Sequence, residues 1–343
     1  MTDTAPSPMA AAPRGAPVFR LPRGLGAGGV YLVVAVLLVA GRALSADFWS
    51  ASSLVKVVQD VSILGIVAVG LSFVTYGGHF VDLAIPVQMA VSGIVAVALL
   101  PWGIVAAALG GMASGALLGL VNGLVVGFLR LNPIIWTLAM MSVLSGVIRW
   151  AYAGRQIYPD EATAAGRAFL DLYHHAVFGV VPLPVVVLII AAVAGHVVMR
   201  HTGYGAALKL TGSNYEVARL SGAGVKRVVA SAFVISSLTS GVAGILLTSF
   251  NKVGAVYIGD GYDFKTVTAV VLGGMTLAGG RGNVAGVMGG VMAIALMNNV
   301  MSLVRIGEIT IGQFQQNIVQ GAVFILVVGI NSFSRRKAGS DDA

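Results

Sequence analysis

Long stretches of this chain carry no Asp, Glu, Lys or Arg, and they constrain its fold more than any other feature. The longest, residues 83–129, runs for 47 residues. Because a helix needs about 20 apolar residues to cross a bilayer, most stretches can hold one crossing and this one can hold two. Pro101-Trp102 divides it, since proline interrupts a helix and tryptophan favours the membrane interface. The charge-free stretches are 24–41, 61–81, 83–129, 131–148, 172–199, 228–251, 266–280, 282–304 and 309–334.

The composition agrees with a membrane protein. Hydrophobic residues make up 57% of the chain and charged residues 10%, with a mean hydropathy of +0.91. Soluble domains carry about 25% charged residues, so this chain cannot cover a surface that faces water. These values exclude a soluble enzyme, a free nucleic-acid-binding protein and a disordered chain. The chain has no cysteine, which excludes disulfides, thiolate metal sites and thiol nucleophiles.

The sequence therefore predicts an all-α integral membrane protein with about ten transmembrane helices, some of them broken or re-entrant. The seventh stretch, 266–280, is the weakest candidate for a crossing. It holds only 15 residues and contains Gly273-Gly274 and Gly279-Gly280. A broken or re-entrant helix is the alternative there.

Basic residues near both ends of the chain predict that both termini lie in the cytoplasm, following the positive-inside rule. Ten crossings then place 13 basic and 5 acidic residues inside, and 8 of each outside. In an alternative interpretation, the first stretch is a signal peptide cleaved near Ala43-Leu44-Ser45, which leaves nine crossings and removes the asymmetry. The basic residues nearest the ends are Arg14, Arg20, Arg23, Arg335, Arg336 and Lys337.

The predicted organisation follows from these crossings. Residues 1–23 form a disordered cytoplasmic tail, 24–334 the transmembrane domain and 335–343 a second cytoplasmic tail. Residues 153–181 form a long outer loop with a short surface helix, and 200–227 form the largest cytoplasmic segment between crossings.

Glycines recur at helical spacing in two of the stretches. On a helix, this spacing makes a flat ridge against which another helix can pack closely. The glycines predicted to pack in this way are Gly111, Gly115, Gly119, Gly123 and Gly127, and later Gly282, Gly286 and Gly290.

Asn122 falls inside the first glycine ridge, and Asn298 and Asn299 fall inside the stretch 282–304. An amide at membrane depth is costly unless it finds a partner or lines a wet cavity. Two interpretations therefore stay open, an inter-helix hydrogen bond and the polar lining of a solute path.

The predicted crossings lack the charged residues that ion coupling or catalysis would need. Asp60, Asp82 and Glu308 fall at the ends of crossings, and no crossing holds an internal pair of a carboxylate and a Lys or Arg. Ion-coupled transporters commonly carry such groups at mid-membrane. The chain also lacks a P-loop, a histidine pair spaced for a metal and a recognisable nucleophile. We expect no catalytic residue, metal or cofactor, and a transporter that is driven by another subunit.

The cytoplasmic segment contains Ser213-Asn214-Tyr215-Glu216, which has the S-x-x-E form of a capping box. Ser213 is predicted to cap a helix over residues 214–221, with Glu216 reaching back to it, and Gly222 is placed to end that helix. One interpretation is a solvated loop helix. The other is a rigid knob that docks into the groove of a partner through Tyr215, Arg219 and Leu220.

From about residue 55 to 333, the chain resembles the permease subunits of bacterial ABC importers for ribose, xylose, arabinose, galactofuranose and similar sugars. The most specific match is Gly261-Tyr262 followed by the run VVLGGMTLAGGRG at residues 270–282. Residues 212–214 and 218–222 match the cytoplasmic loop of the family. Asn122-Gly123 and Asn298-Asn299 match two further signatures.

The resemblance implies a pair of permease subunits, identical or related, two P-loop ATPase subunits and a periplasmic binding protein, in a bacterial inner membrane. It implies that residues 213–222 seat in an ATPase groove, so that ATP hydrolysis by the partner drives alternating access. The chain departs from the family before Asp82, where two residues are inserted, at Ala84 and Pro86, and at residues 263–265.

The predicted function is the translocation path for a monosaccharide or similar neutral polyol, without its own ATPase site. Asn122, Asn298 and Asn299 are the main candidates to line the path, because amides both donate and accept hydrogen bonds. Phe73 and Thr137 are further candidates. Two alternatives remain: an ABC permease for a nucleoside or branched-chain amino acid, and an ion-coupled carrier or channel that works alone.

Overall fold

The computed structural model describes residues 27–78, 81–177, 179–303, 305–306, 309–310, 312, 315–326 and 329. The tails predicted at residues 1–23 and 335–343 lie outside the described residues, as do His79 and Glu308.

Helices account for nearly all of the described secondary structure, and two short antiparallel strand pairs complete it. The α-helices are α1 Ala27–Leu44, α2 Ala51–Tyr76, α3 Ile85–Ala98, α4 Ile104–Phe128, α5 Pro133–Ala151, α6 Ala164–Asp171, α7 Leu183–His201, α8 Gly203–Ser213, α9 Tyr215–Leu220, α10 Val225–Asn251, α11 Tyr262–Leu272 and α12 Val284–Leu303. Residues 315–326 form a further helical segment. The strand pairs are β1 Ala176–Val177 with β2 Val181–Pro182, and β3 Arg305–Ile306 with β4 Ile309–Thr310.

Six of the described helices are long and apolar enough to cross a membrane: α2, α4, α5, α7, α10 and α12. The apolar helices α1 and α3 are shorter. A 3-10 turn at Leu100–Trp102 separates α3 from α4, so the longest charge-free stretch does contain two helices divided at Pro101.

The stretch 266–280 does not form a continuous helical crossing. It contains the second part of α11, which has 11 residues and is therefore only about 16 Å long. The helix ends at Leu272, with Gly273 as its C-cap, and the chain is irregular from there to α12. Glycines at positive φ, Gly274, Gly279, Gly280 and Gly282, account for the irregular path.

Several helices extend beyond the charge-free stretches that predicted them. α2 begins at Ala51 and includes Lys56 and Asp60, because Ser50 caps it by accepting a hydrogen bond from the Ser53 amide. Charge counting therefore located the apolar part of this helix correctly but placed its start ten residues too late, at Val61.

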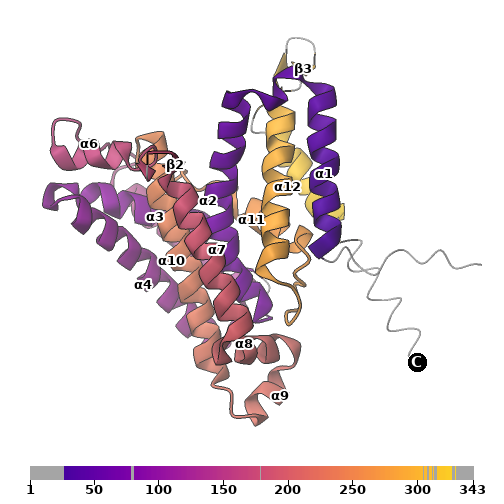
Figure 1. The fold of residues 1–343 in the computed structure, drawn as a ribbon. Helices are drawn as coiled ribbons and strands as arrows, with labels where there is room; N and C mark the ends of the chain where they lie inside the picture. The colour runs from indigo at the N-terminus through magenta and orange to yellow at the C-terminus, as the bar shows by residue number, and fades with distance from the viewer. Residues whose placement is uncertain are drawn as a thin grey trace, which may run out of the picture.

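Two helices, α2 and α10, form the centre of the bundle. Every residue of α2 from Ser62 to Tyr76 is buried, and α10 lies in contact with α2, α3 and α4. On the other side of α2, α12 packs against α1 and α11 (Figure 1).

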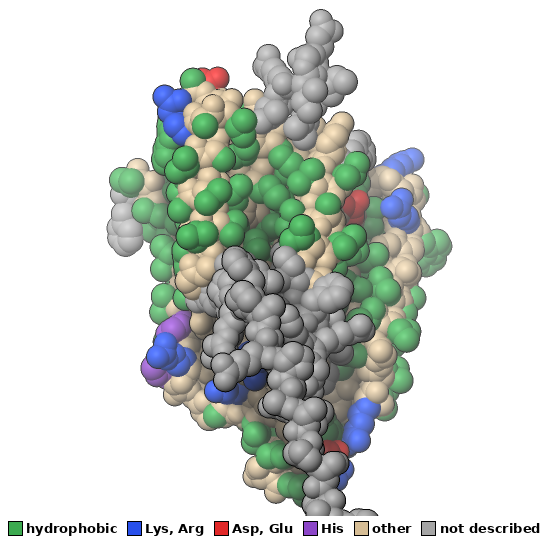
Figure 2. All heavy atoms as spheres, turned by 90° about the vertical axis from the view of Figure 1, so that its right-hand side faces the viewer, with side chains coloured by type: hydrophobic (Ala, Val, Ile, Leu, Met, Phe, Trp, Pro, Cys, Tyr) green, Lys and Arg blue, Asp and Glu red, His purple; other side chains and the backbone are tan. Residues whose placement is uncertain are grey.

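The two ends of the bundle differ. α8 and α9 lie together at one end, hereafter the α9 end, and α6 lies with the β1–β2 pair at the other, hereafter the α6 end (Figure 1). Figure 2 shows hydrophobic side chains over the middle of one face, with most charged side chains towards its upper and lower ends. This pattern suits a protein whose middle faces lipid.

The glycine ridge of α4 lies directly against the backbone of α10. A Cβ on Gly119 would come within 2.7 Å of the Phe233 carbonyl oxygen, and one on Gly123 within 2.7 Å of the Ala230 Cα. Gly111, Gly115 and Gly127 likewise face α10. On α12, Gly286 and Gly290 lie against α11, whereas Gly282 precedes the helix and contacts Met275 instead. The predicted second ridge is wrong at Gly282, because α12 begins only at Val284.

Candidate translocation path and α9 docking surface

The first candidate path residue, Asn122, joins two helices. Its Oδ1 accepts a hydrogen bond of 2.9 Å from the Trp136 Nε1 of α5. The neighbouring Thr137 is fully buried, donates to the Pro133 carbonyl and accepts from the Leu83 amide at 3.1 Å. These contacts tie α4 and α5 to the short segment between α2 and α3.

That segment contains a carboxylate whose burial the sequence analysis did not predict. Asp82 is predicted at an inner end of a crossing, but it is fully buried. Its Oδ1 accepts from the Ala84 amide and its Oδ2 from Gln88 Nε2, both at 3.0 Å. Because α3 begins late, at Ile85, Asp82 lies in the break before that helix rather than at a solvated end. Gln88, the one side-chain amide in residues 83–121, was the signal that could have revealed it.

Asn298 and Asn299 join α12 to two different neighbours. The Asn299 Nδ2 donates to the Ser53 Oγ of α2 at 2.8 Å. The Asn298 Oδ1 accepts from Gln320 Nε2, in the helical segment 315–326, at 2.7 Å. Both amides therefore make inter-helix hydrogen bonds, one of the two roles that the sequence left open.

The structure does not bring the predicted path residues together. Asn122 and Thr137 lie on α4 and α5, whereas Asn298 and Asn299 lie on α12, on the other side of α2 (Figure 1). Phe73 lies in a third place, stacked on Tyr204 of α8 with ring centroids 6.4 Å apart. Among the described residues, Asn122 Nδ2, Asn299 Oδ1 and Gln88 Oε1 are buried without a hydrogen-bond partner.

Charged side chains also occur in the first part of α2, before its buried apolar part. Asp60 lies nine residues after the start of the helix, and interacts electrostatically with Lys56 one turn earlier and with Lys265 of α11. The sequence did not relate Asp60 to Lys265, because the two residues are 205 positions apart and only the packing of α11 on α2 makes them neighbours.

At the α9 end, α8 and α9 form a compact turn whose cap differs from the predicted one. Asn214 has extended backbone angles, and its Oδ1 accepts from the Val217 amide at 3.1 Å. Ser213 is instead the last residue of α8, because the Asn214 amide still bonds to the Leu210 carbonyl. Glu216 forms a 3.0 Å ion pair with Arg219 and does not reach back. The predicted capping box is wrong by one residue.

Gly222 ends α9 at a backbone φ of +76°, which glycine adopts without strain. The amides of Gly222 and Ala223 bond to the carbonyls of Arg219 and Ala218, each at 3.2 Å, in the pattern of a Schellman motif. Ala218 is buried beneath the helix, whereas Leu220 is 81% exposed. A short helix that is fixed at both ends and presents an exposed leucine is suited to contact with a partner.

Glycines join this turn to the rest of the bundle. The Gly280 amide donates to the Tyr76 carbonyl at the end of α2, at 2.9 Å. A Cβ on Gly212 would come within 2.7 Å of the Gly280 nitrogen, and one on Gly279 within 2.6 Å of the Gly78 nitrogen. The ends of α2 and α8 and the loop before α12 thus meet backbone to backbone.

A basic hollow lies beside α9. It has a volume of about 380 Å³, and its lining includes Phe128, Arg130, Tyr215, Arg219 and Lys226. The Lys226 ammonium lies 5.7 Å from the centroid of the Phe128 ring.

These features define a helical membrane protein, with six described helices long enough to span a bilayer and a short helix, α9, that is capped at both ends and lies at one end of the bundle. The profile of the family described as branched-chain amino acid transport system permease component matches residues 53–328, and the chain belongs to this family. It is 30% identical to the L-arabinose ABC transporter permease protein of Azospirillum brasilense, over 90% of this chain and 88% of that protein. It is 29% identical to the ribose import permease protein of Bacillus subtilis strain 168, over 88% of this chain and 91% of the relative. No solved structure matches the chain.

Proposed function

We propose that this chain is the permease subunit of an ABC importer in a bacterial inner membrane, and that it carries a monosaccharide or similar polyol. The α9 helix, capped at both ends and presenting Leu220, is the observation that carries the proposal. The named relatives support it, because they are arabinose and ribose permeases.

The proposed orientation puts the α9 end and both termini in the cytoplasm, with about ten membrane segments of which α11 spans only part of the bilayer. The basic side chains at the α9 end support it, because cytoplasmic loops are enriched in Lys and Arg. They are Arg130, Arg200, Lys209, Arg219, Lys226, Arg227 and Arg281.

The proposed partners follow from the two ends. An ATPase subunit receives α9 in a groove, with Tyr215, Arg219 and Leu220 as contacts, and supplies the ATP hydrolysis. A periplasmic binding protein delivers the solute at the α6 end, and a second permease subunit completes the membrane part. Nucleic acid has no role in this assembly.

Two sets of contacts can transmit a movement of α9 to the membrane helices. Tyr215 lies against Arg130 in the α4–α5 turn, and α5 carries Thr137, which bonds to Leu83 before α3. On the other side, Gly212 of α8 lies against Gly280, which bonds to the end of α2. Movement of α3 and α2 past α10 then opens and closes the path.

The proposed path uses the buried amides. Asn122 and Asn299 each keep one polar atom without a partner, which a sugar hydroxyl could use. Since α2 separates the two residues in this conformation, they line different parts of the proposed path. Thr137, Phe73 and Asn298 hold the helices next to them.

The test is sugar uptake by the complex in proteoliposomes with the ATPase and binding protein encoded by neighbouring genes. Changing Arg219→Glu and Gly222→Glu together should lower uptake roughly tenfold or more, because loss of a central contact costs about 2 kcal/mol or more. Arg42→Glu, which makes the same charge reversal as Arg219→Glu but on exposed α1, is the control. Normal uptake by the double variant, or sugar accumulation by the chain alone, would overturn the proposal.

The cargo needs its own test, because the family description names branched-chain amino acids. Unlabelled ribose or arabinose should compete with labelled sugar for uptake, and leucine or a nucleoside should not. Competition by leucine alone would assign an amino acid as the cargo.

A carrier that works alone is the second candidate, and buried Asp82 is the observation in its favour. The sequence argument against it relied on the absence of carboxylates inside the membrane. Uptake by the isolated chain under a proton or sodium gradient, unchanged by removal of ATP, would establish this candidate.

A further inference from the structure

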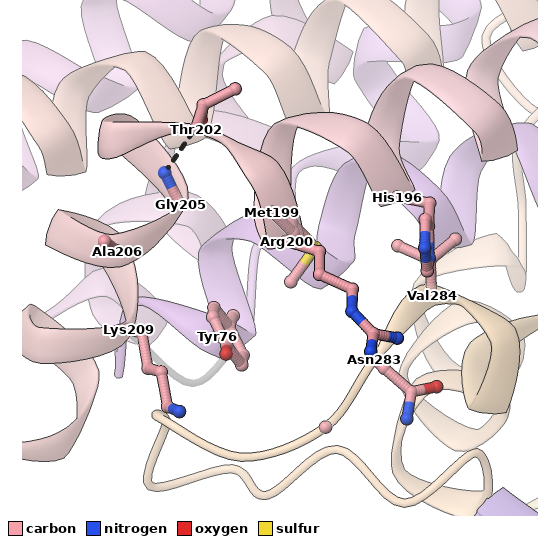
Figure 3. Close-up of a pocket in the computed structure, with 11 residues that line it drawn as sticks. Tyr76, His196, Met199, Arg200, Thr202, Gly205, Ala206, Lys209, Asn283 and Val284 are labelled. Atoms are coloured by element: carbon pink, nitrogen blue, oxygen red, sulfur yellow. Dashed lines mark hydrogen bonds between the residues drawn. The ribbon is translucent and has the colours of Figure 1, made fainter.

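A second cavity at the α9 end is separate from the hollow beside α9. It has a volume of about 340 Å³ and lies where the end of α7, the start of α8, the end of α2 and the segment before α12 meet (Figure 3). Residues of all four elements line it, including Tyr76, His196, Arg200, Lys209 and Asn283.

The lining offers positive charge and hydrogen-bond donors. In Figure 3, Lys209 and Tyr76 approach the cavity from one side, and Arg200 and Asn283 from the other. Asn283 already uses its Oδ1 to accept from the Gly286 amide at 2.7 Å, so its NH2 group is left to donate. No carboxylate is among the described residues that line the cavity. Such a site attracts an anion.

The first turn of α8 adds to the positive electrostatic potential in the cavity. The cavity reaches Thr202, Gly205 and Ala206, at the positive end of the dipole of an 11-residue helix. Thr202 caps the helix by accepting from the Gly205 amide.

An apolar surface leads along α7 to this cavity. Ile189, Val193 and Val197 follow each other at intervals of one helical turn and are 54%, 58% and 45% exposed. Arg200 comes three residues after Val197, so the charged cavity lies where the apolar surface ends. An acyl chain could lie along α7 while its phosphate reaches Arg200 and Lys209.

We propose that this cavity binds the phosphate of an anionic phospholipid, of the phosphatidylglycerol type, from the leaflet at the α9 end. The proposal rests on the membrane orientation given above. The apolar surface of α7 favours a lipid over a soluble phosphate, which would have no use for it. Basic pockets between helices on the cytoplasmic side suit such headgroups.

The test measures phosphatidylglycerol that stays bound to the purified full-length chain, by native mass spectrometry after extraction from vesicles of phosphatidylcholine and phosphatidylglycerol. Arg200→Gln and Lys209→Gln should each weaken retention about fivefold, and together about 25-fold, from the contribution of one cation near an anionic headgroup. Arg200→Lys with Lys209→Arg should retain the lipid, which separates loss of charge from misfolding.

The matched control is Arg227→Gln, which removes an exposed cation from the same end of the bundle but outside this cavity. If it weakens retention as much as Arg200→Gln, general attraction to a basic surface explains the binding and the site is wrong. A second arm adds inorganic phosphate or sn-glycerol 3-phosphate. Displacement of the lipid by either compound at low concentration would assign a soluble phosphate site instead.

Lipid retention is measured without ATP, sugar or partner subunits. If the chain retains the lipid but the complex does not import sugar, only the proposed cargo or coupling fails. If uptake is normal and the double variant still retains the lipid, only the lipid site fails.

Discussion

The Arg130 guanidinium lies over the ring of Tyr215, 5.3 Å from its centroid. Arg130 occupies the turn between α4 and α5 with a φ of +58°, and Tyr215 is the first residue of α9. This contact joins α9 to the two helices that carry Asn122 and Thr137. It links the α9 surface to the part of the bundle that holds the buried polar residues.

Replacing Tyr215 tests this link. A cation over an aromatic ring contributes about 0.5–1 kcal/mol at an exposed site, so Tyr215→Leu should lower sugar uptake per ATP hydrolysed by about two- to fivefold. Tyr215→Phe keeps the ring and should couple normally. The measurement is the ratio of uptake to ATPase activity in proteoliposomes. Equal ratios for the Leu and Phe variants would show that the contact has no part in coupling.

The cap of α9 gives a second prediction. Asn214→Ala removes the bond to the Val217 amide and should destabilise the helix by about 1 kcal/mol, which speeds amide exchange over residues 215–221 roughly fivefold. Ser213→Ala should leave exchange unchanged, since Ser213 makes no cap. Hydrogen exchange followed by mass spectrometry separates the two. Faster exchange in the Ser213 variant would support the capping box expected from the sequence.

The close packing of α4 on α10 gives a third prediction. Gly123→Ala places a methyl group within 2.7 Å of the Ala230 Cα, and overpacking of this kind costs about 1–3 kcal/mol. The Tm of the purified chain should fall. Gly146→Ala, on an exposed part of α5 with no atom within 4 Å of the new Cβ, should not lower it. An unchanged Tm for Gly123→Ala would mean that the two helices are not in contact as described.

The buried side chain of Asp82 gives a fourth prediction. Asp82→Ala leaves the Ala84 amide and Gln88 Nε2 without their acceptor, at a cost of about 1–3 kcal/mol each, and the Tm should fall. Asp82→Asn keeps an oxygen for Ala84, and its amide can donate to Gln88 Oε1, which has no partner in the native structure, if that side chain turns. The Asn variant should therefore fold and transport sugar. A folded Asn variant without transport would show that the negative charge itself is required.

Sequence reasoning found the features that depend on neighbours along the chain. The break at Pro101, the end of α9 at Gly222 and the short helix in the outer loop are local, and the structure contains each of them. It missed the one-residue shift of the α9 cap, because the choice between Ser213 and Asn214 depends on how far α8 continues. It also missed that Asp82 is buried, because burial depends on α3, α5 and α10 together.

The sequence by itself determined that this chain lies in a membrane as a bundle of helices. A helix in lipid must satisfy its backbone internally and present apolar side chains, and both requirements appear in the order of the residues. The tertiary structure alone decided that Asn122 and Asn299 lie on opposite sides of α2, that Lys265 approaches Asp60, and that Arg200 and Lys209 converge on one cavity. Each of these depends on which helices pack together, a choice made by contacts between residues far apart in the chain.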